Sequence, residues 1–330
     1  MTPVKWVYSF LEKYRYKMAA GLLMVTGIAL LTIVNPYISG RIVDDVITGG
    51  NYKLLPVLIG CLLGVVALKG ILRYASQVMF EICSQGVLYS MRDAVYRKLL
   101  QEDFSFYNKN RTGDLMSRQT GDMDAIRHFI AYIIYSVYEN ILLLSLALIM
   151  IFTVNVKLAL AMLVVLPFTA LTTYGQSKSV RPAFMKIRQQ FSSLNTFVQE
   201  NISGNRVVKA FAREDFEIEK FNKENDAYRD AELNAAAIWK KYVPIFEFLS
   251  NILTVVLMLY GGYMVIQGEI TMGNLVTVNG YLWMLTVPLR MAGWWINDIH
   301  RFTTSAEKIY TTYSQEPEIQ EPQQPIVRKH

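Results

Sequence analysis

The sequence contains little charge and few of the residues that bind metals or form disulfides. Only 18% of its 330 residues are charged and 52% are hydrophobic, a balance that excludes an ordinary soluble domain. It has two cysteines, Cys61 and Cys83, and three histidines, none at a spacing typical of zinc ligands. We therefore expect no disulfide framework and no metal site, and the sequence singles out no catalytic residue.

Long apolar runs take the place of the missing charge. Six segments of about 17–25 residues are apolar enough to cross a hydrocarbon core of roughly 30 Å. They are residues 18–34, 54–72, 129–153, 156–174, 245–266 and 275–296. No small-residue cleavage site follows the first segment, so we expect it to be retained rather than removed as a signal peptide. The pattern predicts an all-α membrane protein with six long transmembrane helices.

Basic residues are distributed unequally among the connections between these segments. Of the 33 Lys and Arg, 28 lie in the long loops 73–128 and 175–242 or in the terminal segments 1–17 and 300–330. The positive-inside rule then places both long loops and both termini in the cytoplasm of a multi-pass protein of the cell membrane. Basic and acidic residues are interleaved and no nucleic-acid-binding motif occurs, so the net charge of +6 does not indicate a nucleic-acid partner.

The N-terminal segment combines aromatic residues with lysines. Trp6, Phe10 and Tyr14 recur at helical spacing just before the first apolar segment. This combination is typical of a helix that lies in the lipid headgroup layer, so residues 1–17 are predicted to form an interfacial elbow helix. A frayed cytoplasmic tail is the alternative.

The long loops have almost no helix breakers. Between Arg73 and Phe104 there is one glycine and no proline, and residues 184–201 have neither. We expect the membrane helices to continue into the cytoplasm, where a segment of about 30 residues reaches roughly 45 Å at 1.5 Å per residue. Residues 73–128 and 175–242 are therefore predicted to form helical hairpins within a six-helix domain, residues 18–316.

The tip of the second hairpin is predicted from a reversal of charge in "GNRVVKAFAREDFEIEKF". Basic residues give way to acidic ones between Arg213 and Glu214, which indicates the end of one helix and the start of the next. Phe211 and Phe216 flank the turn. Exposed phenylalanines so far from the membrane need a partner surface, unless they pack within the hairpin.

The first hairpin has a similar tip in "NRTGDLMSRQTGDMDAI". Thr112 and Thr120 are predicted helix N-caps, and the segment between them presents Leu115 and Met116. An apolar tip on each of two helical hairpins indicates that both tips dock into pockets on a cytoplasmic protein.

Four motifs carry a resemblance to a known family. They are "NPYISGRIVDDVI", "FYNKNRTGDLMSRQTGDMDAI", "VQENISGNRVVKAFAREDFEIEKF" and "SAEKI". Over its whole length the chain resembles the transmembrane half of an ATP-binding-cassette (ABC) exporter, of the six-helix kind found in multidrug and lipid exporters. The second and third motifs are similar to the two coupling loops of the family, and the third is the most specific. In the fourth, Lys308 stands where the family usually has arginine.

The resemblance implies a partner assembly and a site. Two such units, identical or not, form a twelve-helix dimer around a cavity for an amphipathic drug, lipid or peptide. Cytoplasmic ATPase domains bind ATP and Mg²⁺ and drive the helices, while this chain holds no cofactor. The implied coupling residues lie in loops 108–124 and 204–221 and are Thr112, Gly113, Leu115, Met116, Arg118, Ala210, Phe211, Arg213, Glu214 and Phe216.

An ATPase motif is missing from the chain. The phosphate-binding loop G-x-x-x-x-G-K-[ST] does not occur, so this chain alone is not expected to hydrolyse ATP. Residues 317–330 are rich in proline and glutamine and are predicted to be a linker toward an ATPase domain. We expect that domain further along the same polypeptide, because the similarity stops where a domain boundary would lie; a separate chain is the alternative.

Few ionisable residues lie within the apolar segments. Counting 1.5 Å per residue places them about 21–28 Å below the outer surface, where charges usually face a cavity or pair with each other. Apart from Lys157 at the outer end of its segment, they are Lys69, Glu139, Glu247 and Arg290. Lys69 and Arg290 are also long enough to reach the inner headgroups. Together with Trp283 and Trp294, the two glutamates favour a cavity for an amphipathic, cationic substrate.

Two other functions fit six spans. A secondary transporter or channel more often shows discontinuous helices or an internal repeat, and the sequence shows neither. A non-transporting membrane receptor would use the same helices to bind a partner. ATP-dependent uptake into inverted vesicles by the complete assembly distinguishes an exporter from both.

Overall fold

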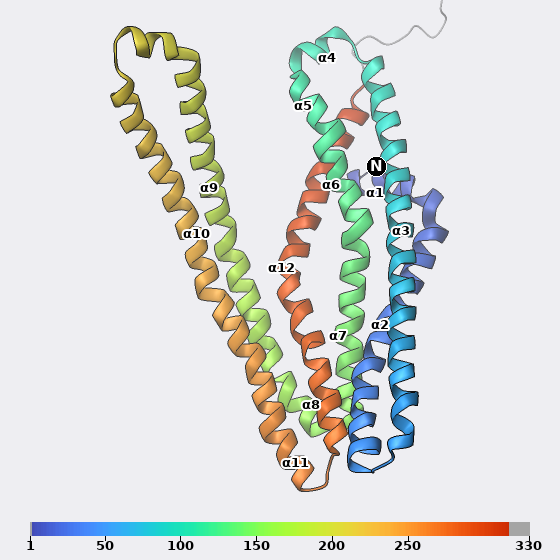
Figure 1. Cartoon of the computed structure of the whole chain (residues 1–330). Coiled ribbons are helices and arrows are strands. Elements are labelled where there is room, and N and C mark those ends of the chain that lie inside the picture. Colours follow the sequence, from blue (N-terminus) through green and yellow to red (C-terminus); the bar gives the residue numbers. More distant parts are fainter. Residues whose placement is uncertain (1, 317–330) are drawn as a thin grey trace, which may run out of the picture. The chain divides into compact units, whose positions relative to one another are not determined.

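The computed structural model describes residues 2–316, and every regular element in that range is a helix (Figure 1). The prediction of an all-α fold is confirmed, whereas the predicted linker 317–330 lies outside the described residues. The described chain forms two compact units. One contains the residues up to Val154 together with those from Ile270 onward, and the other is Asn155–Glu269.

The first unit is a bundle in which α2 packs against α3, α7 and α12 (Figure 1). Helix α3 runs without interruption for 47 residues, about 70 Å at 1.5 Å per residue. The α-helices of this unit are α1 (Pro3–Leu11), α2 (Arg15–Arg41), α3 (Leu55–Gln101), α4 (Phe104–Lys109), α5 (Thr112–Ser117), α6 (Met123–His128), α7 (Ile134–Val154) and α12 (Met272–Ser314). Short 3-10 turns occur at Glu12–Tyr14 and Tyr52–Leu54, and π-helical turns at Ile42–Thr48, Arg118–Asp122 and Phe129–Ile133.

The second unit is a long helical hairpin. Helices α9 and α10 lie side by side (Figure 1). Its elements are α8 (Val156–Leu163), α9 (Val165–Ala210), α10 (Glu214–Val256) and α11 (Gly262–Ile266), with a π-helical turn at Leu257–Gly261. The predicted turn is confirmed: α9 ends at Ala210 and α10 begins at Glu214, where the sequence changes from basic to acidic. Three acidic residues in the first turn of α10 suit the positive end of its dipole.

Five helical runs of the described chain are long and apolar enough to cross a membrane. They contain the first five predicted segments and are Pro3–Thr48, Tyr52–Gln101, Thr112–Val154, Val156–Ala210 and Glu214–Ile266. The sixth segment, 275–296, lies within the uninterrupted helix α12, which is less apolar and is not among the five. Helices α3, α9 and α10 continue well past their apolar segments, as the scarcity of helix breakers predicts.

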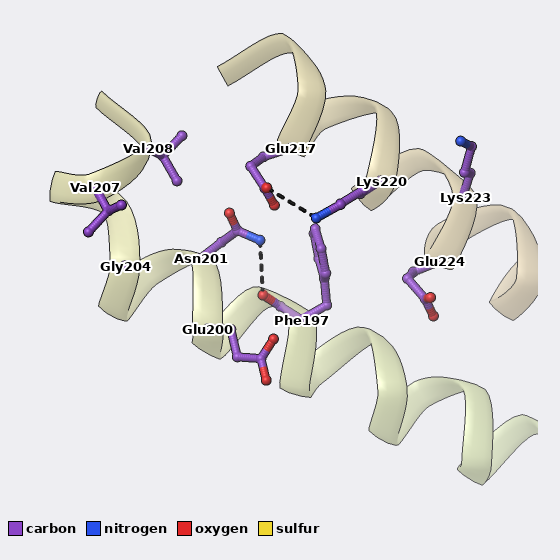
Figure 2. Close-up of a pocket in the computed structure, with 10 residues that line it drawn as sticks. All are labelled: Phe197, Glu200, Asn201, Gly204, Val207, Val208, Glu217, Lys220, Lys223 and Glu224. Carbon is purple, nitrogen blue, oxygen red and sulfur yellow. Dashed lines mark hydrogen bonds and ion pairs between the residues drawn. The ribbon is translucent and has the colours of Figure 1, made fainter. Parts of the chain in front are cut away.

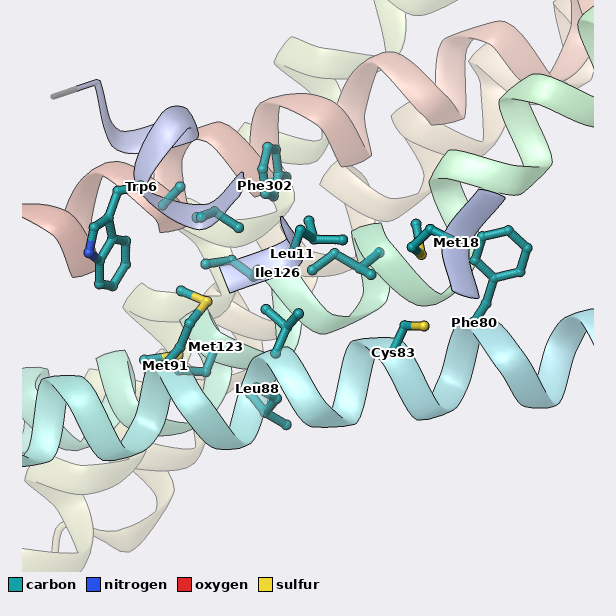
Figure 3. Packing of buried hydrophobic residues seen from close by; sticks show 14 of the residues in the cluster. Trp6, Leu11, Met18, Phe80, Cys83, Leu88, Met91, Met123, Ile126 and Phe302 are labelled. Atoms are coloured by element: carbon teal, nitrogen blue, oxygen red, sulfur yellow. The ribbon is translucent and has the colours of Figure 1, made fainter. Parts of the chain in front are cut away.

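A buried hydrophobic cluster of the first unit joins α1 to α3, α6 and α12 (Figure 3). Trp6 is only 4% exposed, and its ring centroid lies 4.9 Å from that of Tyr313. Phe129 and Phe302 stack with centroids 4.0 Å apart. The predicted N-terminal helix is present, and its tryptophan packs on the aromatic residues of α12. That this helix lies at the membrane interface stays a prediction.

Candidate functional site

The tip of the α9–α10 hairpin presents two exposed phenylalanines, one of which is flanked by cations. Phe211 follows the last residue of α9, and its side chain is 75% exposed. Phe216 lies under the charged groups of Arg213 and Lys220, which are 5.4 Å and 4.5 Å from its ring centroid. Cations over a ring face hold the ring in place. At 75% against 47%, Phe211 is the more exposed of the two rings.

The backbone of this tip forms a Schellman turn, which satisfies the last carbonyls of α9. The amide of Arg213 donates to the carbonyl of Val208 at 3.0 Å, and the amide of Ala212 donates to that of Lys209 at 3.3 Å. Ala212 has a φ of 46°, in the left-handed region that favours glycine. Local hydrogen bonds thus define the turn that carries Phe211.

Beside the tip, α9 and α10 leave an open groove of about 700 Å³ (Figure 2). Val207 and Val208 of α9 line it together with Glu217 and Lys220 of α10, whose charged groups pair at 3.4 Å. All four residues belong to the predicted coupling loop 204–221. This loop therefore combines an exposed phenylalanine with an adjoining groove whose lining mixes apolar residues with charged ones from both helices, Glu200 of α9 among them.

In the first hairpin, the two threonines predicted as helix N-caps, Thr112 and Thr120, do not cap helices. Helix α5 begins after Arg111 without a side-chain cap, and Thr120 lies inside the helical run, donating its hydroxyl to the carbonyl of Met116 at 2.9 Å. The predicted N-caps at Thr112 and Thr120 are therefore wrong. The helix does not stop between them, because π-helical turns carry it from Thr112 into α7.

The predicted coupling residues of this tip divide into exposed and buried ones. Thr112 and Gly113 are exposed, and Met116 is 59% exposed, whereas Leu115 is only 6% exposed. Arg118 donates a hydrogen bond to the hydroxyl of Thr312 on α12. Met116 is thus the apolar side chain at the surface, and Leu115 and Arg118 are held by their own unit.

Asp122 connects the same segment to α12. The hydroxyl of Ser305 donates to its Oδ1 at 2.8 Å, and Lys308 Nζ lies 3.6 Å from the same oxygen. Ser305 and Lys308 belong to "SAEKI", so two motifs that the sequence analysis treated separately meet in the structure. Lys308 reaches the carboxylate despite standing where the family usually has arginine.

A third motif joins α2 to the first turn of α12. Asp44 Oδ1 accepts a hydrogen bond from the amide of Gly273 at 2.7 Å, and Oδ2 accepts one from the hydroxyl of Thr271 at 2.5 Å. A carboxylate at a helix N-terminus satisfies free amides and suits the helix dipole. Gly40 lies so close that a Cβ there would approach the carbonyl oxygen of Gly273 to 2.4 Å. The two helices therefore meet backbone to backbone.

A polar cavity of about 350 Å³ lies among α2, α3, α7 and α12 of the first unit. Glu139 and Trp283, both predicted cavity residues, line it together with Lys69. Glu139 is 8% exposed and Trp283 is 46% exposed. The structure thus brings together three of the residues that the sequence analysis singled out inside the apolar segments.

Arg73 also lines the cavity but was not among the predicted residues, because it lies one residue beyond the predicted segment 54–72. Both terminal nitrogens of Arg73 donate to the carboxylate of Glu139, one of them at 2.6 Å, in a bidentate ion pair. A signal was available, because Arg73 follows Lys69 by four residues and so shares its face of α3.

The remaining predicted cavity residues do not line this cavity. Arg290 and Trp294 lie further along α12 and are exposed, Trp294 to 61%. Glu247 is exposed on α10 of the second unit. Substrate contact by these three residues stays a prediction.

Comparison with known proteins gives these features a common context. The sequence profile of the ABC transporter transmembrane region matches residues 18–289. The chain is 36% identical over 310 residues to the uncharacterized ABC transporter ATP-binding protein YknU of Bacillus subtilis (strain 168), covering 93% of this chain and 52% of that protein. It is 26% identical over 305 residues to the ATP-dependent lipid A-core flippase of Syntrophus aciditrophicus (strain SB), covering 92% and 50%.

A further relative is the multidrug resistance-like ATP-binding protein MdlA of Escherichia coli (strain K12). It is 26% identical over 318 residues, which are 96% of this chain and 53% of that protein. The chain therefore spans about half the length of the curated relatives it matches.

Proposed function

The chain belongs to the family of ABC transporter transmembrane regions, and on that basis we propose that it is the substrate-translocating part of an ATP-driven exporter of amphipathic compounds. The observation that carries the proposal is the uninterrupted passage of α9 and α10 from apolar segments to a charged tip that presents Phe211. The names of the relatives, multidrug resistance-like and lipid A-core flippase, support an amphipathic substrate.

The proposed mechanism uses the long helices as levers. Helix α9 has 46 residues, so it is about 70 Å long at 1.5 Å per residue. A continuous helix transmits a displacement at its tip because its backbone hydrogen bonds resist bending, and in α9 the ladder lacks the bond that Pro182 cannot donate. Loops 108–124 and 204–221 dock on cytoplasmic ATPase domains, where Phe211 and Met116 enter apolar sockets. Closure of those domains then moves the membrane segments.

The complete transporter contains partners that this chain does not supply. ATP and Mg²⁺ bind to the ATPase domains. A second transmembrane unit, identical or not, completes a twelve-helix assembly in the cell membrane. Both termini and both hairpins face the cytoplasm, in agreement with the distribution of the basic residues.

Transport by the complete assembly tests the proposal. Inverted vesicles that contain the chain with its ATPase domains should accumulate a fluorescent amphiphile when ATP is added, and should not do so with a non-hydrolysable analogue. Uptake driven by an ion gradient without ATP would contradict an exporter and would favour a secondary transporter.

Cross-linking tests the docking surface separately. A photo-reactive amino acid at Phe211, which is 75% exposed, should label an ATPase domain in the complete transporter. The same group at Leu63, 67% exposed in the apolar part of α3, is the matched control and should not. Equal labelling from both positions, or none from Phe211, would remove the second tip from the coupling interface.

A further inference from the structure

The cavity of the first unit contains a carboxylate that is already neutralised. Glu139 is 8% exposed, and both of its oxygens accept hydrogen bonds from Arg73. A bidentate guanidinium uses the favourable acceptor positions of a carboxylate and balances its charge. Glu139 is therefore a poor counter-ion for a cationic substrate, which is the role that the sequence alone favoured.

A second cation faces the same cavity. Lys69 lies one helical turn before Arg73 on α3, and its side chain lines the cavity. Among the residues that line the cavity, Glu139 is the only carboxylate and Lys69 and Arg73 are the only cations. One anion and two cations leave a net charge of +1.

A net positive charge at this depth selects for an anion. An ionised group away from bulk water is costly unless an opposite charge or hydrogen-bond acceptor approaches it. The ion pair satisfies Glu139, so the ammonium of Lys69 remains for a ligand. We propose that the cavity binds the anionic headgroup of an amphiphile, a phosphate or a carboxylate, with Lys69 as its counter-ion. This inference rests on the proposed export function and names the substrate class for it.

The other walls of the cavity suit the two ends of such a ligand. Gln77, Tyr132 and Asn140 add neutral groups able to donate hydrogen bonds to phosphate or carboxylate oxygens. Leu143 and Trp283 add apolar and aromatic surface. A charged headgroup and the first part of a hydrocarbon tail therefore find matching surfaces in one cavity. The depth of Lys69, near the inner end of its apolar segment, suits a ligand that enters from the inner leaflet.

Three amphiphiles with the same tail test the inference in the complete transporter. Dodecyl phosphate, dodecyltrimethylammonium and dodecyl maltoside differ in headgroup charge, and each is titrated while ATP hydrolysis is measured in phosphatidylcholine vesicles. We expect half-maximal stimulation by dodecyl phosphate at a concentration about tenfold lower than by dodecyltrimethylammonium, the effect of one partly desolvated charge pair. Adding phosphatidylglycerol to the vesicles distinguishes the source: competition with dodecyl phosphate identifies a bilayer lipid, and its absence a free amphiphile.

Variants that change the net charge of the cavity should shift the preference between dodecyl phosphate and dodecyltrimethylammonium in step with that charge. Lys69→Gln leaves a net charge of zero and should abolish the preference for the anion, and Lys69→Glu should reverse it toward dodecyltrimethylammonium. Asn140→Asp adds a negative charge from α7 and also brings the net charge of the cavity to zero, while Lys69 stays in place. It should likewise abolish the preference for the anion, and it replaces the Lys69 variants if those fail to assemble. Lys53→Gln, in the 3-10 turn just before the same helix, is the matched control and should behave as the unmodified protein.

The outcomes separate the inference from the function on which it rests. Stimulation by all three amphiphiles without regard to charge, or a preference for the cation, would overturn the anionic site and leave an exporter. An anion preference that persists in Lys69→Gln and Asn140→Asp would also overturn it. Absence of ATP-dependent transport for every amphiphile would instead contradict the proposed function.

Discussion

Asp122 and Ser305 are 183 residues apart in the chain and share a hydrogen bond of 2.8 Å. Asp122 belongs to the first coupling segment, and Ser305 lies in the last helix. Arg118, one turn before Asp122, bonds to Thr312, two turns after Ser305, so the two segments run antiparallel and are joined at two levels. Because the side chain of Asp122 is only 13% exposed, water competes little for these bonds. A movement of the first tip is therefore carried directly to α12.

The first prediction concerns this junction. Asp122→Ala removes the acceptor for Ser305 and Lys308, and we expect a loss of about 1–2 kcal/mol of stability and less substrate transported per ATP hydrolysed. Thermal unfolding and parallel transport and hydrolysis assays measure the two effects. Glu307→Gln removes an exposed charge from α12, the helix that carries Ser305 and Lys308, and is the control. A variant of Asp122 with unaltered unfolding and coupling would show that the bond plays no part.

The second prediction concerns the contact of α2 with α12. A Cβ on Gly40 would lie 1.9 Å from the hydroxyl of Thr277 and 2.4 Å from the carbonyl oxygen of Gly273, and backbone cannot move aside as a flexible side chain does. Gly40→Ala should therefore destabilise the first unit by about 2–3 kcal/mol. Gly64→Ala, where nothing lies within 4 Å, is the matched control and should be neutral or slightly stabilising. Equal thermal unfolding of the two variants would contradict the close contact.

The third prediction concerns the turn of the second hairpin. Ala212 occupies a left-handed conformation with φ of 46°, which costs a residue with a Cβ about 1–2 kcal/mol. Glycine relieves this strain but loses more entropy on folding, so Ala212→Gly should stabilise the tip by about 0.5–1 kcal/mol. Ala212→Val should destabilise it. Amide hydrogen exchange at Val207 to Glu217 reports on both, and faster exchange in the glycine variant would contradict the assigned turn.

Features that depend on local sequence were predictable. The turn between Arg213 and Glu214 follows from helix dipoles that act within one turn. Likewise, the continuity of α3 follows from the scarcity of breakers, whereas α9 stays helical through Pro182 although proline disfavours a helix interior. The threonine N-caps failed because a cap is only a local preference. The segment at Thr120 stays helical through π-helical turns, and the packing of this segment against α12 favours the continuous helix.

Features that depend on the register between helices were not predictable from one sequence. The pair of Arg73 and Glu139 joins residues 66 positions apart, and hydropathy placed only one of them inside an apolar segment. Similarly, Leu115 and Met116 are adjacent and equally apolar, yet 6% and 59% exposed. Periodicity alone does not say which face of a short helix has a partner. For the same reason, the sequence alone favoured a cationic substrate, whereas Lys69, Arg73 and Glu139 together give the cavity a net charge of +1.

The fourth prediction measures the ion pair of the cavity. Glu139→Gln leaves Arg73 without its partner in a partly buried position and should destabilise the protein by about 2 kcal/mol, less than for a fully buried pair. The double variant Arg73→Gln with Glu139→Gln should recover at least half of that loss, because no unpaired charge remains. The double variant also keeps Lys69, so the preference for an anionic amphiphile should persist. Purely additive losses in a double-mutant cycle would show that the two side chains do not interact.

The last prediction concerns Phe211. Its side chain is 75% exposed at the tip of the hairpin, so its removal should cost the isolated fold little, whereas the loss of an apolar anchor from a docking socket typically weakens binding by about 2 kcal/mol or more. Phe211→Ala should therefore leave thermal unfolding of the transmembrane part and nucleotide binding by the ATPase domains unchanged, and should abolish the stimulation of ATP hydrolysis by substrate. Ile202→Ala, an equally exposed apolar position on α9 at 73%, is the control. If Phe211→Ala keeps substrate-stimulated hydrolysis at the level of this control, the second tip does not couple the two parts through Phe211.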